Sequence, residues 1–216
     1  MTSTPVLALL AGKAMPFANR ERSAIAKWYL NGPVTIGPLG IEGDEQANQR
    51  YHGGPDKALH LYPHDHYARW HADAPGHPLL TMAGAFGENI STTGLTEDQV
   101  CIGDRFRLGK ALIEISQGRE PCWKQAHRMD WPKLPKLMVK EGRSGWYFRV
   151  IEPGIAEAPC ELMLTDRPYP EWTVRRVFRM VVTGDERNDA AAFRDLAKLD
   201  VLFKGWRERA AAIAGR

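Results

Sequence analysis

The stretch Arg105-Phe106-Arg107-Leu108-Gly109-Lys110-Ala111-Leu112-Ile113-Glu114-Ile115-Ser116 predicts a β-hairpin. On both sides of the Gly109-Lys110 pair, apolar residues alternate with polar ones, and this period of two is typical of strands that bury one face. The second strand leads directly into the segment Gly118-Arg119-Glu120-Pro121-Cys122. Any chemistry of Cys122 therefore takes place just beyond the end of a strand.

Much of the chain around this hairpin has the same character. From about residue 5 to residue 165, short apolar runs alternate with glycines and prolines, a pattern that predicts many short strands joined by loops. We expect a mainly β fold, a barrel or a sandwich, interrupted by one helix at Pro63–Ala72. Further strands are expected at Pro5–Leu10, Val34–Ile36, Phe148–Ile151 and Cys160–Leu164.

After Pro170 the hydrophobic pattern changes to that of an amphipathic helix. From Val174 onward apolar residues recur at i, i+3, i+4 and i+7, Thr173 is placed to cap the helix, and Gly184 lies just beyond its end. Two further stretches, 188–199 and 200–213, repeat this pattern. The sequence therefore predicts a β-rich domain over residues 1–166 and a small three-helix domain over residues 167–216.

The composition is that of a globular protein. The 216 residues are 44% hydrophobic and 25% charged, with a net charge of +3, and a chain of this length can bury a core without disulfide or metal staples. The three cysteines form no C-x-x-C pair, which argues against a disulfide scaffold or a cysteine-rich zinc site. Because the sequence has no long apolar stretch and no signal-peptide pattern, we expect a cytoplasmic protein without a membrane segment.

Cys122 is the first candidate for chemistry. Residues 118–149 contain eight lysines and arginines against three acidic residues, and positive charge of this kind favours the thiolate form of a cysteine. A thiolate can act as a nucleophile or as a soft ligand for a transition metal. A buried structural role is the alternative for Cys122, and it is our interpretation of Cys101 and Cys160, which lack comparable surroundings.

Three other patterns suggest different functions. Six histidines between residues 52 and 77 are typical of a zinc hydrolase, although His64 and His66 would lie on different sides of the predicted helix. The glycine-rich segment 37–54 could expose backbone N–H groups to a phosphate. The arginines at 175, 176 and 179 allow nucleic-acid binding by the helical tail, but interspersed acidic residues favour a solvated helix face.

Taken in chain order, several segments together resemble the MOSC family, named for the C-terminal domain of molybdenum-cofactor sulfurases. The resemblance is closest to its YiiM-type branch, which is linked to resistance against N-hydroxylated purines, and the tail from Arg167 resembles the three-helix domain of that branch. The segments that carry it are Arg22–Lys27, Gly40–Asp44, His52–Ala58, Tyr62-Pro63, His66-Tyr67, Phe86–Asn89, Cys101–Asp104, Ser116–Cys122 and Gly142–Val150. Two departures are Gly118, where the branch usually has proline, and a longer loop at Trp28–Gly32.

The resemblance implies a MOSC-type β-barrel-like fold that holds a molybdenum cofactor (Mo-molybdopterin). Cys122 matches the cysteine that ligates the metal, and it is the expected catalytic residue. His52 and Asp44 are the expected proton donors. The positions that match the cofactor pocket are Ser23, Lys27, His52, Lys57, Asn89, Ser116 and Arg119.

The resemblance also implies an activity, the reduction of small N-hydroxylated compounds such as hydroxylaminopurines and amidoximes to amines and amidines. The chain has no haem, ferredoxin or dinucleotide-binding pattern, so a separate flavin or iron–sulfur electron-transfer protein is implied. A carrier of the cofactor or of sulfur, without reductase activity, is the alternative. The helical tail could pack on the barrel, cover the pocket or mediate a homodimer; we expect no membrane or nucleic-acid partner.

Overall fold

The hairpin predicted at residues 105–116 is present in the computed structural model, which describes residues 3–48 and 53–215. Strands β9 (Arg105–Leu108) and β10 (Ala111–Gly118) are antiparallel, with Leu108 opposite Ala111. Gly109 in the turn has φ +58°, and a Cβ there would clash with the carbonyl oxygen of Ile155. The turn therefore requires glycine because residues 154–156, distant in the sequence, pack directly against it.

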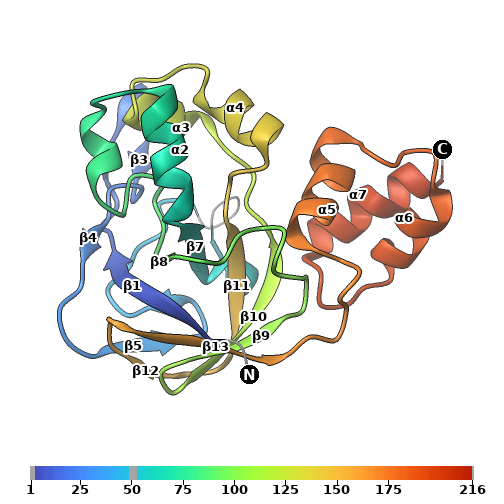
Figure 1. Ribbon diagram of the computed structural model, residues 1–216, viewed down its shortest axis with the longest axis horizontal. Helices are drawn as coiled ribbons and strands as arrows, with labels where there is room; N and C mark the ends of the chain where they lie inside the picture. The colour runs from blue at the N-terminus through green and yellow to red at the C-terminus, as the bar shows by residue number, and fades with distance from the viewer. Residues whose placement is uncertain (1–2, 49–52, 216) are drawn as a thin grey trace.

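The hairpin belongs to a closed barrel of seven strands (Figure 1). Every pairing around the ring is antiparallel except that of β7 with β8, and the ring closes where β1 pairs with β13. Closure leaves no unpaired edge around the ring. In ring order the other strands are β11 (Trp146–Glu152), β7 (Leu59–Pro63), β8 (Ile90–Thr92), β1 (Ser3–Ala11) and β13 (Cys160–Asp166).

Shorter strands extend this barrel. β4 (Trp28–Tyr29) pairs with the end of β1, and β5 (Val34–Gly37), β6 (Gly40–Ile41) and β12 (Gly154–Ala156) form a separate three-stranded sheet. β2 (Met15–Pro16) and β3 (Arg22–Ser23) form a small hairpin. The mainly β fold and all four further strand predictions are confirmed.

Helices cover one end of the barrel (Figure 1). The helix expected from Pro63 begins instead at Asp65, because Pro63 is the last residue of β7. Tyr62, Trp70 and Phe86 form a second hydrophobic cluster beneath these helices with Met138. The helical elements here are η2 (Pro55–Lys57), α2 (Asp65–Asp73), η3 (Pro78–Thr81), α3 (Trp123–Arg128) and α4 (Leu134–Glu141), and a 3₁₀ turn, η1 (Ala18–Arg20), lies in the β2–β3 hairpin.

The chain after β13 is helical, as the sequence predicts. α5 (Val174–Phe178) continues into a π-helical turn, η4 (Arg179–Thr183), and α6 (Ala190–Ala197) and α7 (Lys204–Ala214) follow. Thr173 accepts a hydrogen bond from the backbone N–H of Arg176, and Gly184 ends η4 in the left-handed conformation, so both predicted end signals are confirmed. Among the described residues, no helix combines the length and apolar character needed to cross a membrane.

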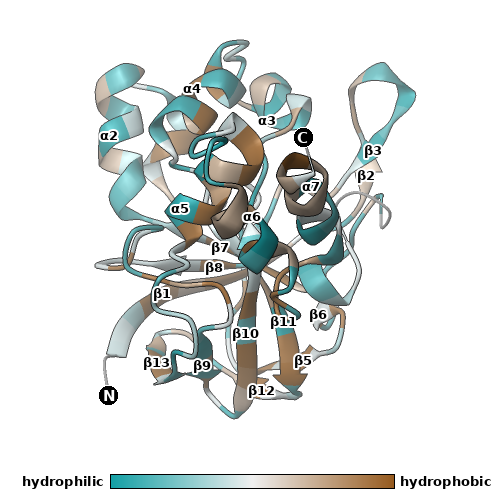
Figure 2. Ribbon diagram, turned by 90° about the vertical axis from the view of Figure 1, so that its right-hand side faces the viewer, coloured by the Kyte–Doolittle hydropathy of each residue, from teal (hydrophilic) through white to brown (hydrophobic). Residues whose placement is uncertain are grey.

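These C-terminal helices pack against the barrel wall around β10 (Figure 2). Phe178, Phe193 and Trp206 belong to the same hydrophobic cluster as the barrel core. Glu120, which follows β10, accepts hydrogen bonds from Trp206 Nε1 and from Arg209 Nη1, both at 2.8 Å. The tail is thus fixed to the turn that precedes Cys122.

Gly118 makes this close packing possible. A Cβ on Gly118 would lie 3.1 Å from Trp206, 3.2 Å from Phe178 and 3.4 Å from Val174, all side-chain atoms of the tail. The glycine that departs from the branch pattern therefore lets the end of β10 rest directly on the helices.

Replacing Gly118 with valine should push these helices away from β10. Overpacking of this kind costs about 1–3 kcal/mol, and each kcal/mol corresponds to about 2–4 °C in the melting temperature of a chain of this size. Gly37→Val is the matched control, because a Cβ there has its nearest neighbour at 3.9 Å. Thermal melting of the two variants checks the prediction, and an equal or smaller loss in Gly118→Val would contradict it.

Candidate functional site

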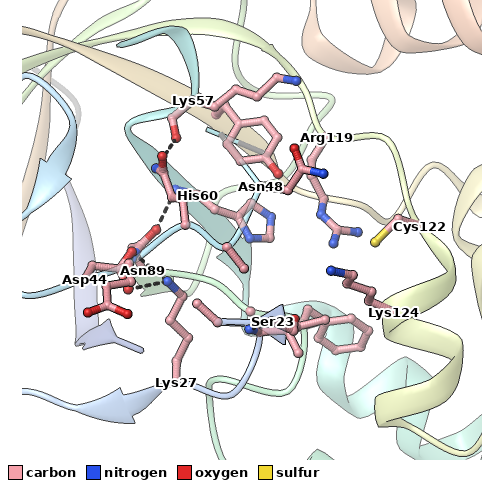
Figure 3. Close-up of a pocket in the computed structure, with 18 residues that line it drawn as sticks. Ser23, Lys27, Asp44, Asn48, Lys57, His60, Asn89, Arg119, Cys122 and Lys124 are labelled. Atoms are coloured by element: carbon pink, nitrogen blue, oxygen red, sulfur yellow. Dashed lines mark hydrogen bonds and ion pairs between the residues drawn. The ribbon is translucent and has the colours of Figure 1, made fainter. Parts of the chain in front are cut away.

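Cys122 stands at the junction between β10 and α3, where it faces a cavity (Figure 3). Its thiol is partly exposed, and no disulfide involves it. The side chain of Gln125 accepts a hydrogen bond from the backbone N–H of Cys122 at 3.1 Å. This contact fixes the backbone from which the thiol projects.

The cavity draws its walls from distant parts of the chain. The segment after β3 forms one wall, the segment after β6 another, and the barrel strands β7 and β11 the floor. Its lining residues are Ser23, Ala24, Ile25, Lys27, Asp44, Glu45, Gln46, Ala47, Asn48, Lys57, His60, Phe86, Gly87, Asn89, Arg119, Cys122, Lys124 and Tyr147.

The guanidinium group of Arg119 is the most informative feature of this cavity. Its side chain points toward the Cys122 thiol, and the Lys124 ammonium points into the same cavity (Figure 3). That ammonium donates to the Arg22 carbonyl oxygen and pairs with Glu21, both at 2.8 Å. Arg119 is only 5% exposed, and among the described residues its Nε and Nη1 atoms have no hydrogen-bond partner. Buried N–H groups without an acceptor are costly, and charged ones bind anions strongly. The site therefore fits an anionic group beside the thiol.

A buried ion pair between Lys27 and Asp44 lies deeper in the cavity. The Lys27 ammonium contacts the two carboxylate oxygens at 2.5 and 2.7 Å, and both side chains are 6% exposed. Burial lowers the pKa of Lys27, while the charge of Asp44 opposes that shift. Asp44 also accepts hydrogen bonds from Gly12 N–H at 2.6 Å and from Asn89 Nδ2 at 2.9 Å.

His60 lies on the floor of the cavity with almost no exposure to solvent. Burial, followed by the positive charge of Arg119, holds the pKa of His60 well below its usual value of 6.5. Burial likewise raises the pKa of Tyr147 and lowers that of Lys57. The imidazole of His60 is therefore neutral near pH 7, and the positive charge of the cavity comes from lysine and arginine side chains.

The structure brings most of the predicted site residues together. Ser116 is the exception among those described, because it does not line the cavity. Its hydroxyl is fully buried and lies 2.5 Å from the Asp56 carbonyl oxygen and 3.2 Å from the Tyr147 carbonyl oxygen. These contacts connect β10 to the neighbouring segments of chain. His52 lies outside the described residues. Those that do line the cavity are Ser23, Lys27, Asp44, Lys57, Asn89, Arg119 and Cys122.

The cavity residues that sequence reasoning did not assign include Lys124, His60 and Tyr147. Lys124 carried a signal, because it lies in the basic segment and two residues after Cys122. His60 was noted only as one of the clustered histidines. Tyr147 lies in the family-like segment Gly142–Val150, but no local pattern placed its side chain in the cavity. It reaches the cavity through the pairing of β11 with β10, where it lies opposite Gln117.

The basic segment 118–149 contributes less to the cavity than its composition suggests. Of its eight cations only Arg119 and Lys124 line the cavity. Arg143 instead lies over the Trp70 ring at 3.8 Å from the ring centroid, and Arg149 bonds to Asp56 and Glu114. Lys27 and Lys57, from outside the segment, supply the remaining positive charge.

The histidines that are clustered in the sequence make separate contacts in the structure. His66 Nε2 lies 2.7 Å from a carboxylate oxygen of buried Glu97, His64 stacks on Tyr67, and His77 contacts the Met129 carbonyl oxygen. Within residues 3–48 and 53–215, no three histidine, cysteine or acidic side chains are arranged to hold a metal ion. The described histidines therefore give no support to the zinc alternative.

The arginines of the tail are engaged in ion pairs. Arg175 contacts Asp98 at 2.7 Å, Arg176 contacts Glu186 at 2.8 Å and Arg179 contacts Asp185 at 2.7 Å. These acidic partners offset the positive charge that a nucleic-acid interface would need.

Comparison with known proteins places this geometry in a family. The MOSC domain model matches residues 48–163. Protein YiiM of Escherichia coli is 47% identical over 154 residues, which cover 70% of this chain and 69% of that protein. A protein named "Reductase" from Gibberella moniliformis is 42% identical over 160 residues, which cover 74% of this chain but only 28% of that longer protein.

A solved structure extends the match to the helical tail. The crystal structure of YiiM from Geobacillus stearothermophilus has a TM-score of 0.82 and 33% identity, and the alignment covers 98% of this chain and 99% of that one. The family model, the sequence relatives and the fold therefore agree. This chain belongs to the MOSC domain family and is a homologue of YiiM.

Proposed function

We propose that the cavity beside Cys122 binds the molybdenum cofactor and that the protein reduces N-hydroxylated compounds to amines or amidines. MOSC domains are associated with molybdenum-cofactor binding. The observation that carries the proposal is the buried guanidinium of Arg119, which shares a cavity with the Cys122 thiol and whose Nε and Nη1 atoms have no hydrogen-bond partner among the described residues. This combination suits a ligand that has both a thiophilic metal and an anionic group.

The residues of the cavity fit such a ligand. The Cys122 thiolate is a soft ligand of the kind that transition metals of this type accept. Arg119, Lys57 and Lys124 offer positive charge to the phosphate of the cofactor. Arg119 can also donate hydrogen bonds from Nε and Nη1, which have no partner within residues 3–48 and 53–215.

When bound, the cofactor supplies a two-electron redox centre for reductive cleavage of the N–O bond. The overall change consumes one N-hydroxylated substrate, two electrons and two protons, and it yields the amine or amidine and one water. We assign the electrons to a separate flavin or iron–sulfur protein. The name of the Gibberella relative, "Reductase", agrees with this reaction class.

Within the cavity, Asp44 serves best as a positioning residue. Among the described residues, its carboxylate accepts hydrogen bonds from the Lys27 ammonium, from Asn89 Nδ2 and from the Gly12 N–H. Of the two proton donors expected from the sequence, Asp44 lines the cavity and His52 lies outside the described residues, so both assignments stay predictions. Asp44 also holds Lys27 and Asn89 at the cavity wall.

Cys122→Ser tests the metal assignment. In protein made in a host that synthesises the cofactor, this variant should lose molybdenum and turnover with an N-hydroxylated substrate, because a hydroxyl is a poor ligand in place of the thiolate. Cys101→Ser, far from the cavity, should retain both. Elemental analysis and an assay with an artificial electron donor check the prediction.

Three outcomes would change the proposal. Reduction retained by Cys122→Ser would contradict the role of the thiolate. Molybdenum that depends on Cys122 without any turnover would favour the carrier alternative. Zinc in place of molybdenum would favour the hydrolase alternative.

Asp44→Asn tests the positioning role. The variant leaves the buried Lys27 without its carboxylate, and breaking a buried ion pair in this way costs about 3–5 kcal/mol of unfolding free energy. Glu45→Gln is the matched control. The neighbouring Glu45 is exposed, pairs with Lys13 and accepts a hydrogen bond from the Ala14 N–H, which a glutamine oxygen can also accept, so this variant should change stability little. Urea unfolding of both proteins checks the prediction, and similar midpoints for the two variants would refute it.

A further inference from the structure

A buried carboxylate that the proposed function does not use lies behind Arg119. Glu97, in the loop between β8 and β9, is 2% exposed and does not line the cavity beside Cys122. Its Oε1 atom accepts hydrogen bonds from the backbone N–H groups of Ser144 at 2.9 Å and Gly145 at 2.7 Å. Its Oε2 atom lies 2.7 Å from His66 Nε2 of α2. The carboxylate therefore joins α2 to the segment that precedes β11.

Gly145 carries this contact to Arg119. Its N–H donates to Glu97, and its carbonyl oxygen accepts a hydrogen bond from the backbone N–H of Arg119 at 3.0 Å. Gly145 has φ +72°, and a Cβ there would clash with the Leu61 carbonyl oxygen, so this position requires glycine. A single residue thus connects the Glu97 carboxylate to the Arg119 backbone.

The same segment also contacts the floor of the cavity. The Ser144 carbonyl oxygen lies 3.4 Å from Nε2 of His60, and His60 lines the cavity. Residues 144 and 145 therefore support two cavity residues, Arg119 through its backbone and His60 through its side chain.

Glu97 also connects this segment to the C-terminal helices. Its backbone carbonyl oxygen accepts a hydrogen bond from the Arg175 N–H at 3.0 Å, in the first turn of α5. The Arg175 side chain in turn donates to the Glu141 carbonyl oxygen at 2.7 Å. The loop that carries Glu97 is thus held from a second side.

The charge of Glu97 makes it a strong acceptor. Burial favours the neutral acid, but the contacts with His66 and with the Gly145 N–H outweigh burial and hold the pKa of Glu97 below its usual value. The carboxylate is therefore ionised near pH 7, and hydrogen bonds to an ionised group are stronger than those to a neutral one. Without Glu97, the N–H groups of two buried residues would lose their acceptor, which is costly unless the segment moves.

We propose that Glu97 is a positioning residue for the anion-binding group of the cavity. Through Gly145 it fixes the backbone of Arg119, so that the buried guanidinium points toward the Cys122 thiol (Figure 3). The inference rests on the proposed function, because that function gives the guanidinium its anionic ligand.

The rates at which iodoacetate and iodoacetamide alkylate Cys122 test this role in full-length protein made without the cofactor. Iodoacetate is an anion and iodoacetamide is neutral, so the ratio of the two rates reports the positive charge beside the thiol. Arg119→Met sets the ratio expected when the guanidinium is absent. Peptide mapping by mass spectrometry separates Cys122 from Cys101 and Cys160.

Two variants should move the guanidinium. Glu97→Met has nearly the same size but no acceptor for the N–H groups, and Glu97→Asp keeps the charge on a side chain that is one methylene shorter. Each should lower the ratio of rates at least about threefold, toward that of Arg119→Met. If Glu97→Met does not fold, Glu97→Asp decides alone.

Two further variants should leave the ratio within about twofold of the wild type. Glu97→Gln keeps an oxygen that can accept from both N–H groups. Asp104→Asn is the matched control, because Asp104 is also a buried carboxylate that accepts from a backbone N–H and pairs with a cation, here the Cys101 N–H and Arg167, but it does not line the cavity.

The direction of the change separates positioning from a simple loss of charge. Removing the negative charge of Glu97 without moving Arg119 would raise the ratio, whereas a displaced guanidinium lowers it. An unchanged or raised ratio in Glu97→Asp, or an equally large fall in Glu97→Gln or Asp104→Asn, would overturn the proposal.

The positioning role and the proposed function can fail separately. A ratio lowered as expected, in a protein that takes up no molybdenum in a cofactor-producing host, would support the positioning role and contradict the proposed function. Molybdenum and turnover in the wild type, with a ratio that the Glu97 variants do not lower, would support the function and overturn the positioning role.

Discussion

The carboxylate of Glu120 joins the barrel to the C-terminal helices at the turn that carries Cys122. Its Oε1 atom accepts hydrogen bonds from Trp206 and Arg209 of α7, both at 2.8 Å. Because Arg119 precedes this contact and Cys122 follows it, the same contact holds both residues at the inner cavity, the one that Lys27 and Asp44 also line. The proposed cofactor site therefore depends on how the C-terminal helices pack against this turn.

The charged side chains of the inner cavity are arranged so that most of the buried charge is compensated. The charge of Lys27 is offset by Asp44, and His60 avoids charge because burial and Arg119 lower its pKa. Arg119 has two N–H groups with no such compensation among the described residues. A protein holds a group of this kind in place only where the rest of the fold stabilises it or where a ligand completes it. The barrel and the tail supply the first condition, and we propose the cofactor for the second.

The sequence predicted what depends on local pattern. The hairpin at 105–116, the cap at Thr173 and the helix end at Gly184 each follow from neighbouring residues, and the structure confirms them. Barrel closure through β1 and β13, and the arrival of Tyr147 beside Cys122, depend on pairings between distant strands that no local pattern reveals. The family resemblance identified Lys27, Lys57 and Asn89 as cavity residues. The count of positive charges in 118–149 also included Arg143 and Arg149, which do not line the cavity but contact Trp70 and Asp56.

The most direct test of this account is the pterin and molybdenum content of Arg119→Met, measured beside the wild type and Arg128→Met after expression in a cofactor-producing host. Arg128 bonds to the Ala85 carbonyl and does not line the inner cavity, so its variant is the matched control. We predict near-equimolar pterin and molybdenum in the wild type and the control. Arg119→Met should retain at least about tenfold less, because it loses charged hydrogen bonds to the bound anion. Equal cofactor content in all three proteins would contradict the claim that the buried guanidinium receives the cofactor.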